Sequence, residues 1–149
     1  MNDSEFMQYQ NALIFLRDGT PVRIRPLLAE DKAELARAFE RLSTQSRYQR
    51  FFSPVRELSP QRLSYLTEID YVNHFAWGAF ALAEADAPLV GVARFIRLRD
   101  EPHSADTAVA VIDEYHRRGL GQFLMRALAE VAVESGIRRF VSRCADLAV

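Results

Sequence analysis

The sequence predicts an α/β fold, in which one mixed sheet carries both antiparallel and parallel strands. A hairpin signal, Asp18-Gly19, stands between two short runs of β-forming residues near the N-terminus. Three longer runs of strand character follow one another between residues 75 and 112, joined by short polar turns, which favours an antiparallel meander. A loop, an amphipathic helix and a further strand continue the pattern to residue 142, an order typical of a βαβ unit with parallel strands.

The first element is expected to be a β-hairpin. Residues 13–16 are apolar, and residues 22–25 alternate between apolar and basic side chains, which is the period of a half-buried strand. Asp18-Gly19 predicts a type I′ turn between them, because both central residues of that turn need a positive φ. Residues 1–12 are polar and weakly patterned, so we expect a lead-in there that is disordered or forms a short helix.

Three helices should follow the hairpin. Apolar residues recur at helical spacing over residues 30–42. Residues 43–52 predict a second, short helix with a mixed basic and aromatic face. Ser59 and Pro60 suit the N-cap and the first position of a third helix over residues 60–67. We expect these helices to form one wall of a substrate cleft.

The meander should consist of three adjacent strands over residues 75–83, 89–98 and 105–112. Short turns join these runs, so an antiparallel arrangement is the simplest one. Gly91 lies inside the second run and predicts a bulge or a close approach to the backbone, since a strand interior otherwise disfavours glycine.

The last helix is expected to run from residue 120 to about residue 134. Gly136 stands where a glycine would end this helix, and residues 137–142 return as a strand. The strand should lie parallel to the one before the helix, through a right-handed crossover. The apolar face of the helix consists of Leu120, Phe123, Leu124, Ala127, Leu128, Val131 and Ala132.

The composition is that of one globular domain, which we expect to span residues 1–149. Of these residues 49% are hydrophobic and 26% charged, and the net charge of −1 argues against a nucleic-acid binder. No apolar run reaches the roughly 20 residues of a membrane helix, and no signal-peptide pattern is present. Cys144 is the only cysteine, and the three histidines lack metal-ligand spacing. We therefore expect a soluble, cytoplasmic protein without a metal.

Residues 113–125 join the meander to the last helix and form the most informative stretch. Arginines and glycines meet there at a helix start, where free backbone N–H groups and the helix dipole favour an anion. A Walker P-loop needs lysine and then serine or threonine after its second glycine, but Gln122 and Phe123 stand there. A dinucleotide fingerprint needs a third glycine at the position of Leu124. Both phosphate-binding schemes are therefore excluded.

The segment His116-Arg117-Arg118-Gly119-Leu120-Gly121 resembles the Gln/Arg-x-x-Gly-x-Gly/Ala acyl-CoA loop of the GNAT acyltransferase superfamily, with histidine at the first position. The resemblance extends over residues 17–142. It implies the GNAT fold, in which a strand or hairpin, helices and an antiparallel meander precede the βαβ unit. Four further segments are similar to the GNAT domain of bacterial Pat-type protein lysine acetyltransferases: residues 46–54, 57–60, 69–71 and 89–94.

The resemblance implies acetyl-CoA as the acyl donor. Its pyrophosphate would lie on the loop, and its pantetheine arm would follow the backbone of the preceding strand. The cofactor-binding residues implied in this way are Val109, Ala110, Val111, His116, Arg117, Arg118, Gly119, Leu120, Gly121 and Gln122. Arg126, Arg138 and Arg139 are candidates for outer contacts.

Direct attack by an amine on an acyl group needs a base, because a lysine side chain has a pKa of about 10.4 and starts protonated. In Pat-type enzymes a glutamate near the start of the strand before the loop resembles that base. The matching residue is Asp106, whose side chain is one methylene shorter, and Glu114 is a weaker alternative. Cys144 is expected to pack and not to act as a nucleophile. We expect Trp77 and Phe80 in the core.

The resemblance therefore implies an acyl-CoA-dependent N-acyltransferase that moves acetyl to a protein lysine or a small amine by direct attack. The alternative is a non-catalytic acyl-CoA-binding module derived from such an enzyme. The chain ends at Val149, whereas the family continues with a helix and two strands. We therefore expect a truncated domain without the last helix and strands of the fold. An uncovered edge strand associates readily, so we also expect a homo-oligomer in which a second copy covers it.

Overall fold

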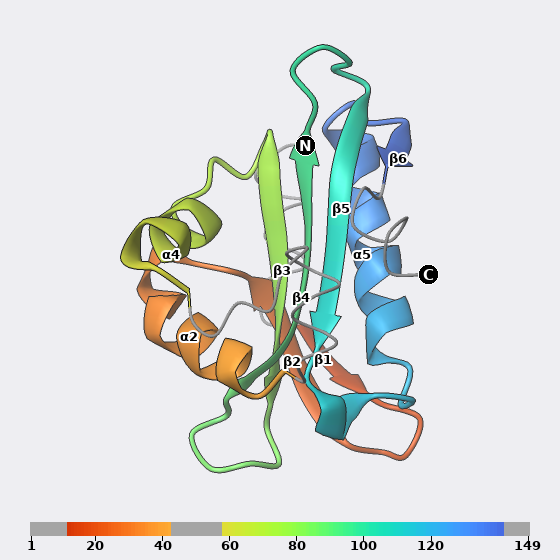
Figure 1. Ribbon diagram of the computed structural model, residues 1–149. Coiled ribbons are helices and arrows are strands. Elements are labelled where there is room, and N and C mark those ends of the chain that lie inside the picture. The colour runs from red at the N-terminus through yellow and green to blue at the C-terminus, as the bar shows by residue number, and fades with distance from the viewer. Residues whose placement is uncertain (1–11, 43–57, 142–149) are drawn as a thin grey trace.

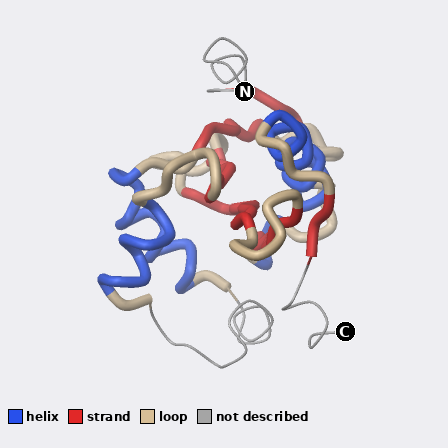
Figure 2. Tube along the Cα trace, turned by 90° about the horizontal axis from the view of Figure 1, so that it is seen from above, coloured by secondary structure: helices blue, strands red, loops and turns tan. Residues whose placement is uncertain are grey.

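A computed structural model describes residues 12–42 and 58–141 (Figure 1). Within these residues six strands form one sheet in the order β1-β2-β3-β4-β5-β6, and all neighbours are antiparallel except β5 and β6. Helices α2 and α4 cover one face of the sheet, and α5 covers the other (Figure 2). The predicted fold class is confirmed. The strands are β1 (Ala12–Phe15), β2 (Pro21–Pro26), β3 (His74–Ala81), β4 (Leu89–Arg97), β5 (Ser104–Val111) and β6 (Arg139–Val141), and the α-helices are α2 (Lys32–Glu40), α4 (Pro60–Thr67) and α5 (Leu120–Glu134).

The predicted hairpin is present, but its predicted turn type is wrong. Leu16 accepts a hydrogen bond from the Gly19 N–H (2.9 Å) and donates its own N–H to the Thr20 carbonyl (2.9 Å). Gly19 has a φ of +87°, whereas Asp18 does not adopt a positive φ. The Asp18 side chain instead accepts hydrogen bonds from the Thr20 N–H (3.1 Å) and hydroxyl (2.6 Å). The loop is therefore a three-residue turn that ends in a left-handed glycine.

The helical region agrees with the sequence where the structure describes it. Ser59 caps α4 through a hydrogen bond from the Arg62 N–H (3.1 Å), and the helix has the predicted bounds. The helix expected over residues 30–42 begins with a 3₁₀ turn, Ala29–Asp31, and continues as α2. The helix expected over residues 43–52 lies outside the described residues.

A buried ion pair joins this 3₁₀ turn to β2. The Asp31 carboxylate accepts two hydrogen bonds from the Arg25 guanidinium (2.8 and 2.9 Å) and one from the Leu28 N–H (2.7 Å). Asp31 is buried, with only 6% of its surface exposed. Burial alone would raise the pKa of this carboxyl, but the hydrogen bonds and the positive charge of Arg25 hold it below its usual range. The pair therefore fixes the entry to α2.

Gly91 lies beside a β-bulge and also allows a close approach to the backbone, the two alternatives that the sequence left open. Ala79 lies opposite Gly91 and Phe80 opposite Leu89, so Val90 is an extra residue in β4, as in a β-bulge. A Cβ on Gly91 would also lie 3.2 Å from Leu124 and 3.3 Å from Leu120. The missing side chain lets α5 pack closely on β4.

The βαβ unit has the predicted order and direction. Gly136 adopts a φ of +84° after α5, and the next N–H, that of Ile137, returns to the Ala132 carbonyl (2.9 Å). Strand β6 pairs parallel with β5, with Ser104 opposite Arg139 and Asp106 opposite Val141. In the described part of the chain β6 is one of the two edge strands, and β1 is the other. The second copy expected on this edge stays a prediction.

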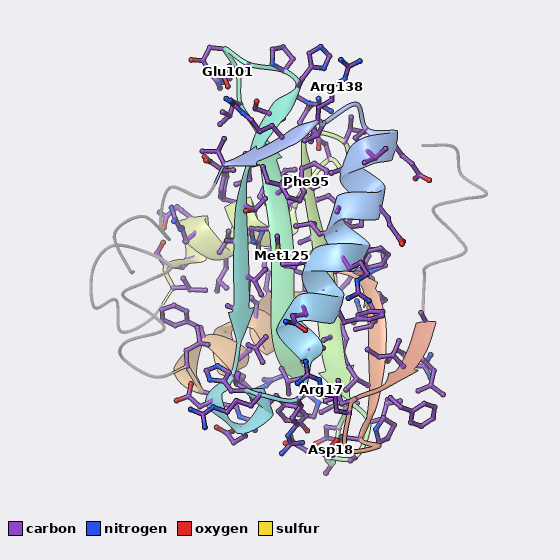
Figure 3. All side chains as sticks on the ribbon, turned by 90° about the vertical axis from the view of Figure 1, so that its right-hand side faces the viewer. Arg17, Asp18, Phe95, Glu101, Met125 and Arg138 are labelled. Atoms are coloured by element: carbon purple, nitrogen blue, oxygen red, sulfur yellow. The ribbon has the colours of Figure 1, made fainter. Side chains whose placement is uncertain are left out.

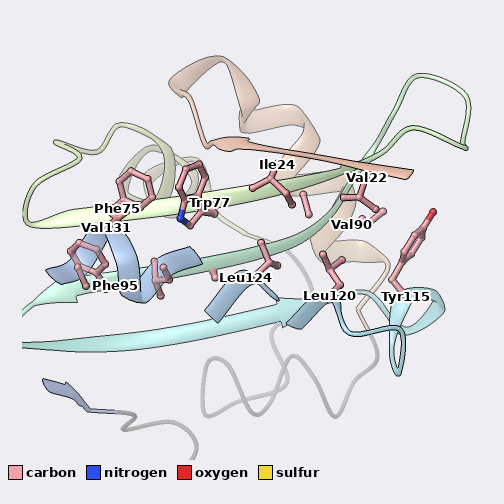
Figure 4. Close-up of a cluster of buried hydrophobic side chains, with 14 of the residues drawn as sticks. Val22, Ile24, Phe75, Trp77, Val90, Phe95, Tyr115, Leu120, Leu124 and Val131 are labelled. Carbon is pink, nitrogen blue, oxygen red and sulfur yellow. The ribbon is translucent and has the colours of Figure 1, made fainter. Parts of the chain in front are cut away.

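The core has two parts, one on each face of the sheet. Between α5 and the sheet, Phe75, Trp77 and Phe95 pack with Leu124 and Val131 (Figure 4). A smaller cluster, which includes Phe80, lies under α2 and α4. Trp77 and Phe80 are 1% and 6% exposed, so the prediction that both belong to the core is confirmed. Among the described residues, no helix combines the length and the apolar character that crossing a membrane requires.

Candidate active site

The glycine loop forms where β5 gives way to α5. A 3₁₀ turn, Asp113–Tyr115, follows the strand, and left-handed φ values at Arg117 (+64°) and Gly119 (+89°) then reverse the chain direction. Gly119 is the N-cap of α5, and its carbonyl accepts the first helical hydrogen bond, from the Phe123 N–H (3.1 Å). The N–H groups of residues 120–122 lie in the first turn and have no acceptor within the helix. They provide donors for an anion.

An open hollow of about 420 Å³ lies in front of these N–H groups. It brings together all the implied cofactor-binding residues except Ala110 and Arg118. Arg17 and Tyr115, which the sequence did not single out, also line it. This loop hollow is lined by Arg17, Val109, Val111, Tyr115, His116, Arg117, Gly119, Leu120, Gly121 and Gln122.

In the part of the chain that the structure describes, half of β5 has no strand beside its outer edge, and this open edge leads into the loop hollow. Within these residues β6 pairs with residues 104–106 of β5. The Ser104 carbonyl accepts from the Leu98 N–H, just after β4, and the Ile112 N–H donates to the Val90 carbonyl in β4. Even-numbered residues of β5 therefore use their backbone groups on that side. The backbone groups of Val109 and Val111 therefore point away from β4. Those of Ala110 point toward β4, and its side chain lines an apolar pocket on the opposite face of the sheet.

His116 occupies the first position of the loop motif and contacts the end of β5. Its Nε2 lies 2.6 Å from the Val111 carbonyl oxygen. A carbonyl can only accept a hydrogen bond, so Nε2 carries the proton in this contact. The imidazole therefore ties the start of the loop to the open edge of the strand.

The hairpin turn supports the loop from the far end of the sequence. The Arg17 N–H donates to the Arg118 carbonyl (3.3 Å), and its guanidinium donates to Gln122 Oε1 (3.1 Å). Arg17 thereby lies beside the start of α5 (Figure 3). Asp18 pairs with the Arg118 guanidinium at 3.6 Å. Sequence reasoning missed Arg17, because no local pattern distinguishes it from an ordinary turn residue.

The three arginines predicted as outer contacts lie at two different ends of the molecule. Arg139 pairs with Glu101 (2.9 Å), and Arg138 lies at the same end of the molecule, opposite the end that holds Arg17 (Figure 3). Neither lies near the loop. Arg126 stands on α5 within reach of the hairpin turn, in a hollow that Arg17 also lines.

Asp106 lies opposite Val141, the last residue of β6 that the structure describes. Alternation along the strand puts its side chain on the same face as those of Ala108 and Ala110, which line the apolar pocket beneath α2. Asp106 therefore lies on the strand that leads to the glycine loop, and the open edge lies between them. In the described ranges no three His, Cys, Asp or Glu side chains gather closely enough to hold a metal ion.

The Glu114 carboxylate is paired with Arg41. Its carboxylate accepts a hydrogen bond from the Arg41 guanidinium (2.7 Å), which lowers its pKa. Arg41 also reaches Glu84 (3.4 Å), and Glu84 accepts a hydrogen bond from the Tyr115 hydroxyl (2.7 Å). Burial and this contact raise the pKa of Tyr115 to about 12. A carboxylate with a lowered pKa is a weaker base, which argues against Glu114 as a proton acceptor.

The Acetyltransferase (GNAT) family model matches residues 37–147, which include β5, the glycine loop and α5. The chain belongs to the GNAT acetyltransferase family. Members of this family use acetyl-CoA as the acyl donor. The residues of the loop hollow fit such a donor, since helix N–H groups and cationic side chains suit a pyrophosphate and an open strand edge suits an amide-containing arm.

Relatives of this GNAT chain carry the same assignment. The acetyltransferase PA5475 of Pseudomonas aeruginosa is 35% identical over 127 residues, which are 85% of this chain and 68% of that protein. The acetyltransferase Pat of Mycolicibacterium smegmatis is 36% identical over 129 residues, 86% of this chain but only 38% of that protein. The crystal structure of the GNAT domain of S. lividans PAT superposes with a TM-score of 0.81 at 29% identity, over 94% of this chain and 79% of that domain. The resemblance to Pat-type domains is confirmed, and this GNAT chain is an N-acetyltransferase.

Alanine is expected to be destabilising at Gly119 and tolerated at Gly121. At Gly119 a Cβ would lie 3.1 Å from Arg17 Nε, in a conformation that costs an ordinary residue roughly 1–2 kcal/mol. At Gly121 the nearest atoms, on Val109 and Val111, are 4.0 Å away, and alanine favours a helix. We expect Gly119→Ala to lower both stability and CoA affinity, and Gly121→Ala to retain both. Thermal unfolding with and without CoA measures the difference; equal behaviour of the two variants would contradict this role of Gly119.

Proposed function

We propose that this chain transfers an acetyl group from acetyl-CoA directly to an amine, on a protein lysine or a small molecule. One observation carries the proposal: the outer edge of β5, which the described residues leave open beyond Asp106, leads to the loop hollow at the N-terminus of α5. A thioester arm can be bound along such an edge while its phosphates bind at the helix start.

The residues of the loop hollow would bind and orient the donor. The N–H groups of residues 120–122, with Arg17 and Arg117, provide hydrogen bonds and positive charge for the pyrophosphate. The outward backbone groups of Val109 and the Val111 N–H are available to amide groups of the pantetheine arm. Acetyl-CoA supplies an acyl group already activated as a thioester.

Asp106 is the proposed general base. The attacking nitrogen must lose a proton as the new N–C bond forms, and a carboxylate on the same strand can accept it directly or through one water. Aspartate is one methylene shorter than the glutamate of Pat-type domains, so the acceptor must approach β5 more closely or use that water. A backbone N–H of the open edge can stabilise the negative charge that develops on the carbonyl oxygen.

Thermal unfolding with acetyl-CoA, CoA and NAD tests the binding step. A ligand that binds only the folded state at 100 times its Kd raises stability by about 2.7 kcal/mol. We expect stabilisation by acetyl-CoA and CoA and none by NAD. Stabilisation by NAD alone would overturn the assignment of the loop.

Transfer is tested separately, by incubating the protein with acetyl-CoA and a panel of lysine peptides and small amines, and by following release of the CoA thiol. We expect release that depends on one class of amine. Tight CoA binding without transfer to any amine would favour the alternative of a non-catalytic acyl-CoA-binding module.

A further inference from the structure

Arg41 joins three separate segments of the chain at the end of α2. It is the C-cap residue of that helix, and its backbone N–H donates to the Ala38 carbonyl (3.0 Å). Its guanidinium donates to Glu114 (2.7 Å), which lies in the 3₁₀ turn before the glycine loop. The same guanidinium reaches Glu84 (3.4 Å), in the turn between β3 and β4. One side chain therefore ties α2 to the segment that leads into the loop.

Tyr115 continues this link into the glycine loop. Arg41 contacts one carboxylate oxygen of Glu84, and the Tyr115 hydroxyl donates to the other (2.7 Å). The Tyr115 ring is buried in the core between α5 and the sheet (Figure 4), and the Arg118 guanidinium lies over it, 4.8 Å from its centroid. Contacts therefore run without a break from Arg41 to Arg118 in the loop.

The groups in this network are suited to hold a fixed arrangement. A planar guanidinium has several donors in set directions, so it can hold two carboxylates at a set separation. The hydrogen bond from Arg41 lowers the pKa of Glu114, which keeps this carboxylate ionised at neutral pH. Burial and the contact with Glu84 raise the pKa of Tyr115 to about 12, so the hydroxyl keeps the proton that it donates. The network is therefore complete at neutral pH.

Arg41 itself stays outside the loop hollow. In the described part of the chain the residues that line this hollow include Tyr115 but not Arg41. A donor bound there would thus contact the loop and not the guanidinium that supports it. A loop already fixed in its binding conformation binds more tightly than a mobile one, because less conformational freedom is lost on binding.

We propose that Arg41 is a positioning residue for the acyl-donor site. Through Glu114, and through Glu84 with Tyr115, it holds the glycine loop in the orientation that binds the donor. This inference rests on the proposed function, because it requires the acyl donor to bind in the loop hollow. Loss of the guanidinium leaves the donor contacts present but less well ordered, so it weakens the binding of CoA without abolishing it.

The test measures the affinity for CoA by calorimetry on the full chain. We expect Arg41→Gln to weaken CoA about two- to fivefold, the range of partly exposed ion pairs. Arg41→Lys keeps a positive charge that can pair with one carboxylate, so it should recover part of the loss. Arg37→Gln is the matched control, since Arg37 lies one turn earlier on α2 and pairs with Glu34 of the same helix. It should leave the affinity unchanged.

A second control separates positioning from general stability. Asp31→Asn breaks the buried ion pair with Arg25 and so lowers stability, but Asp31 does not line the loop hollow. We expect this variant to bind CoA as tightly as the wild-type protein at a temperature where both are folded. An equal loss of affinity in Asp31→Asn and Arg41→Gln would show a general effect of stability and would overturn the inference.

A double-mutant cycle tests the network as a unit. Tyr115→Phe removes the hydroxyl and keeps the ring, and both Tyr115 and Arg41 act through Glu84. The loss of affinity in the double variant should therefore be smaller than the product of the two single losses. Two losses that simply multiply would show independent roles and contradict the network.

The remaining outcomes separate the inference from the proposed function. Wild-type affinity for CoA in Arg41→Gln overturns the positioning role but leaves donor binding intact. An Arg41→Lys variant that binds no better than Arg41→Gln contradicts a role of the charge and also overturns it. If CoA does not bind the wild-type protein, the proposed function itself fails, and the inference fails with it.

Discussion

Asparagine in place of Asp106 is expected to lower the rate of acetyl transfer about 10²- to 10⁴-fold, the range that a general base contributes. The amide has nearly the shape of the carboxylate but cannot take up a proton at neutral pH. CoA affinity should not change, because the proposed donor contacts are made by the loop, by the backbone of Val109 and by the Val111 N–H. Steady-state kinetics together with a CoA titration measure the two effects independently.

Three further variants sharpen this experiment. Asp100→Asn changes an exposed carboxylate in the turn before β5 and should leave turnover within about twofold, as expected of a surface substitution. Glu114→Gln removes the negative charge that pairs with Arg41 and should affect stability more than chemistry. Asp106→Glu restores the side-chain length found in Pat-type domains and should retain activity. Full turnover in Asp106→Asn would remove this residue from the mechanism.

Asparagine in place of Asp31 is expected to lower the free energy of unfolding by about 2–4 kcal/mol. The substitution leaves the Arg25 guanidinium without its charged partner, and breaking a buried ion pair from one side typically costs 3–5 kcal/mol. The lower range allows for the partial exposure of Arg25, whose side chain is 23% accessible. For a chain of this size the melting temperature should fall by roughly 5–10 °C. Asp100→Asn again serves as the control, with almost no change.

The ion pair between Arg25 and Asp31 also makes the stability of the protein depend on pH in the acid range. The folded pKa of Asp31 is lowered, so its contribution is complete above the unfolded value near 3.9 and is lost as pH falls through the folded pKa. Wild-type stability should therefore approach that of Asp31→Asn below about pH 4, measured by urea unfolding across pH. A difference between the two proteins that stays constant down to strongly acidic pH would contradict a charge-based role.

Local signals in the sequence were sufficient for most of the fold. Ser59 and Pro60 predicted the start of α4, and Gly136 predicted the end of α5, because capping involves only residues within one turn. The type I′ turn was wrong since Asp18 uses its side chain to bond Thr20 and so needs no positive φ.

The candidate site could be predicted from sequence where it follows a motif and not where it depends on distant residues. Residues 116–122 are contiguous, from the loop into the first turn of α5, so their order alone indicates an anion site. The pairing of Glu114 with Arg41 joins segments 73 residues apart, and no local pattern indicates it. The orientation of Ala110 toward β4 depends on which edge of β5 is paired, which only the assembled sheet determines.

The contact between Arg17 and Gln122 spans 105 positions in the sequence, and this has a consequence for how the protein acquires activity. Contacts of such large separation form slowly, because the closure entropy of a long chain segment opposes them. Helix α5, whose hydrogen bonds are local, can form early during refolding. The ability to bind the acyl donor should return only when the hairpin turn and the start of α5 have met. In a stopped-flow experiment, recovery of helical circular dichroism would therefore precede recovery of CoA binding.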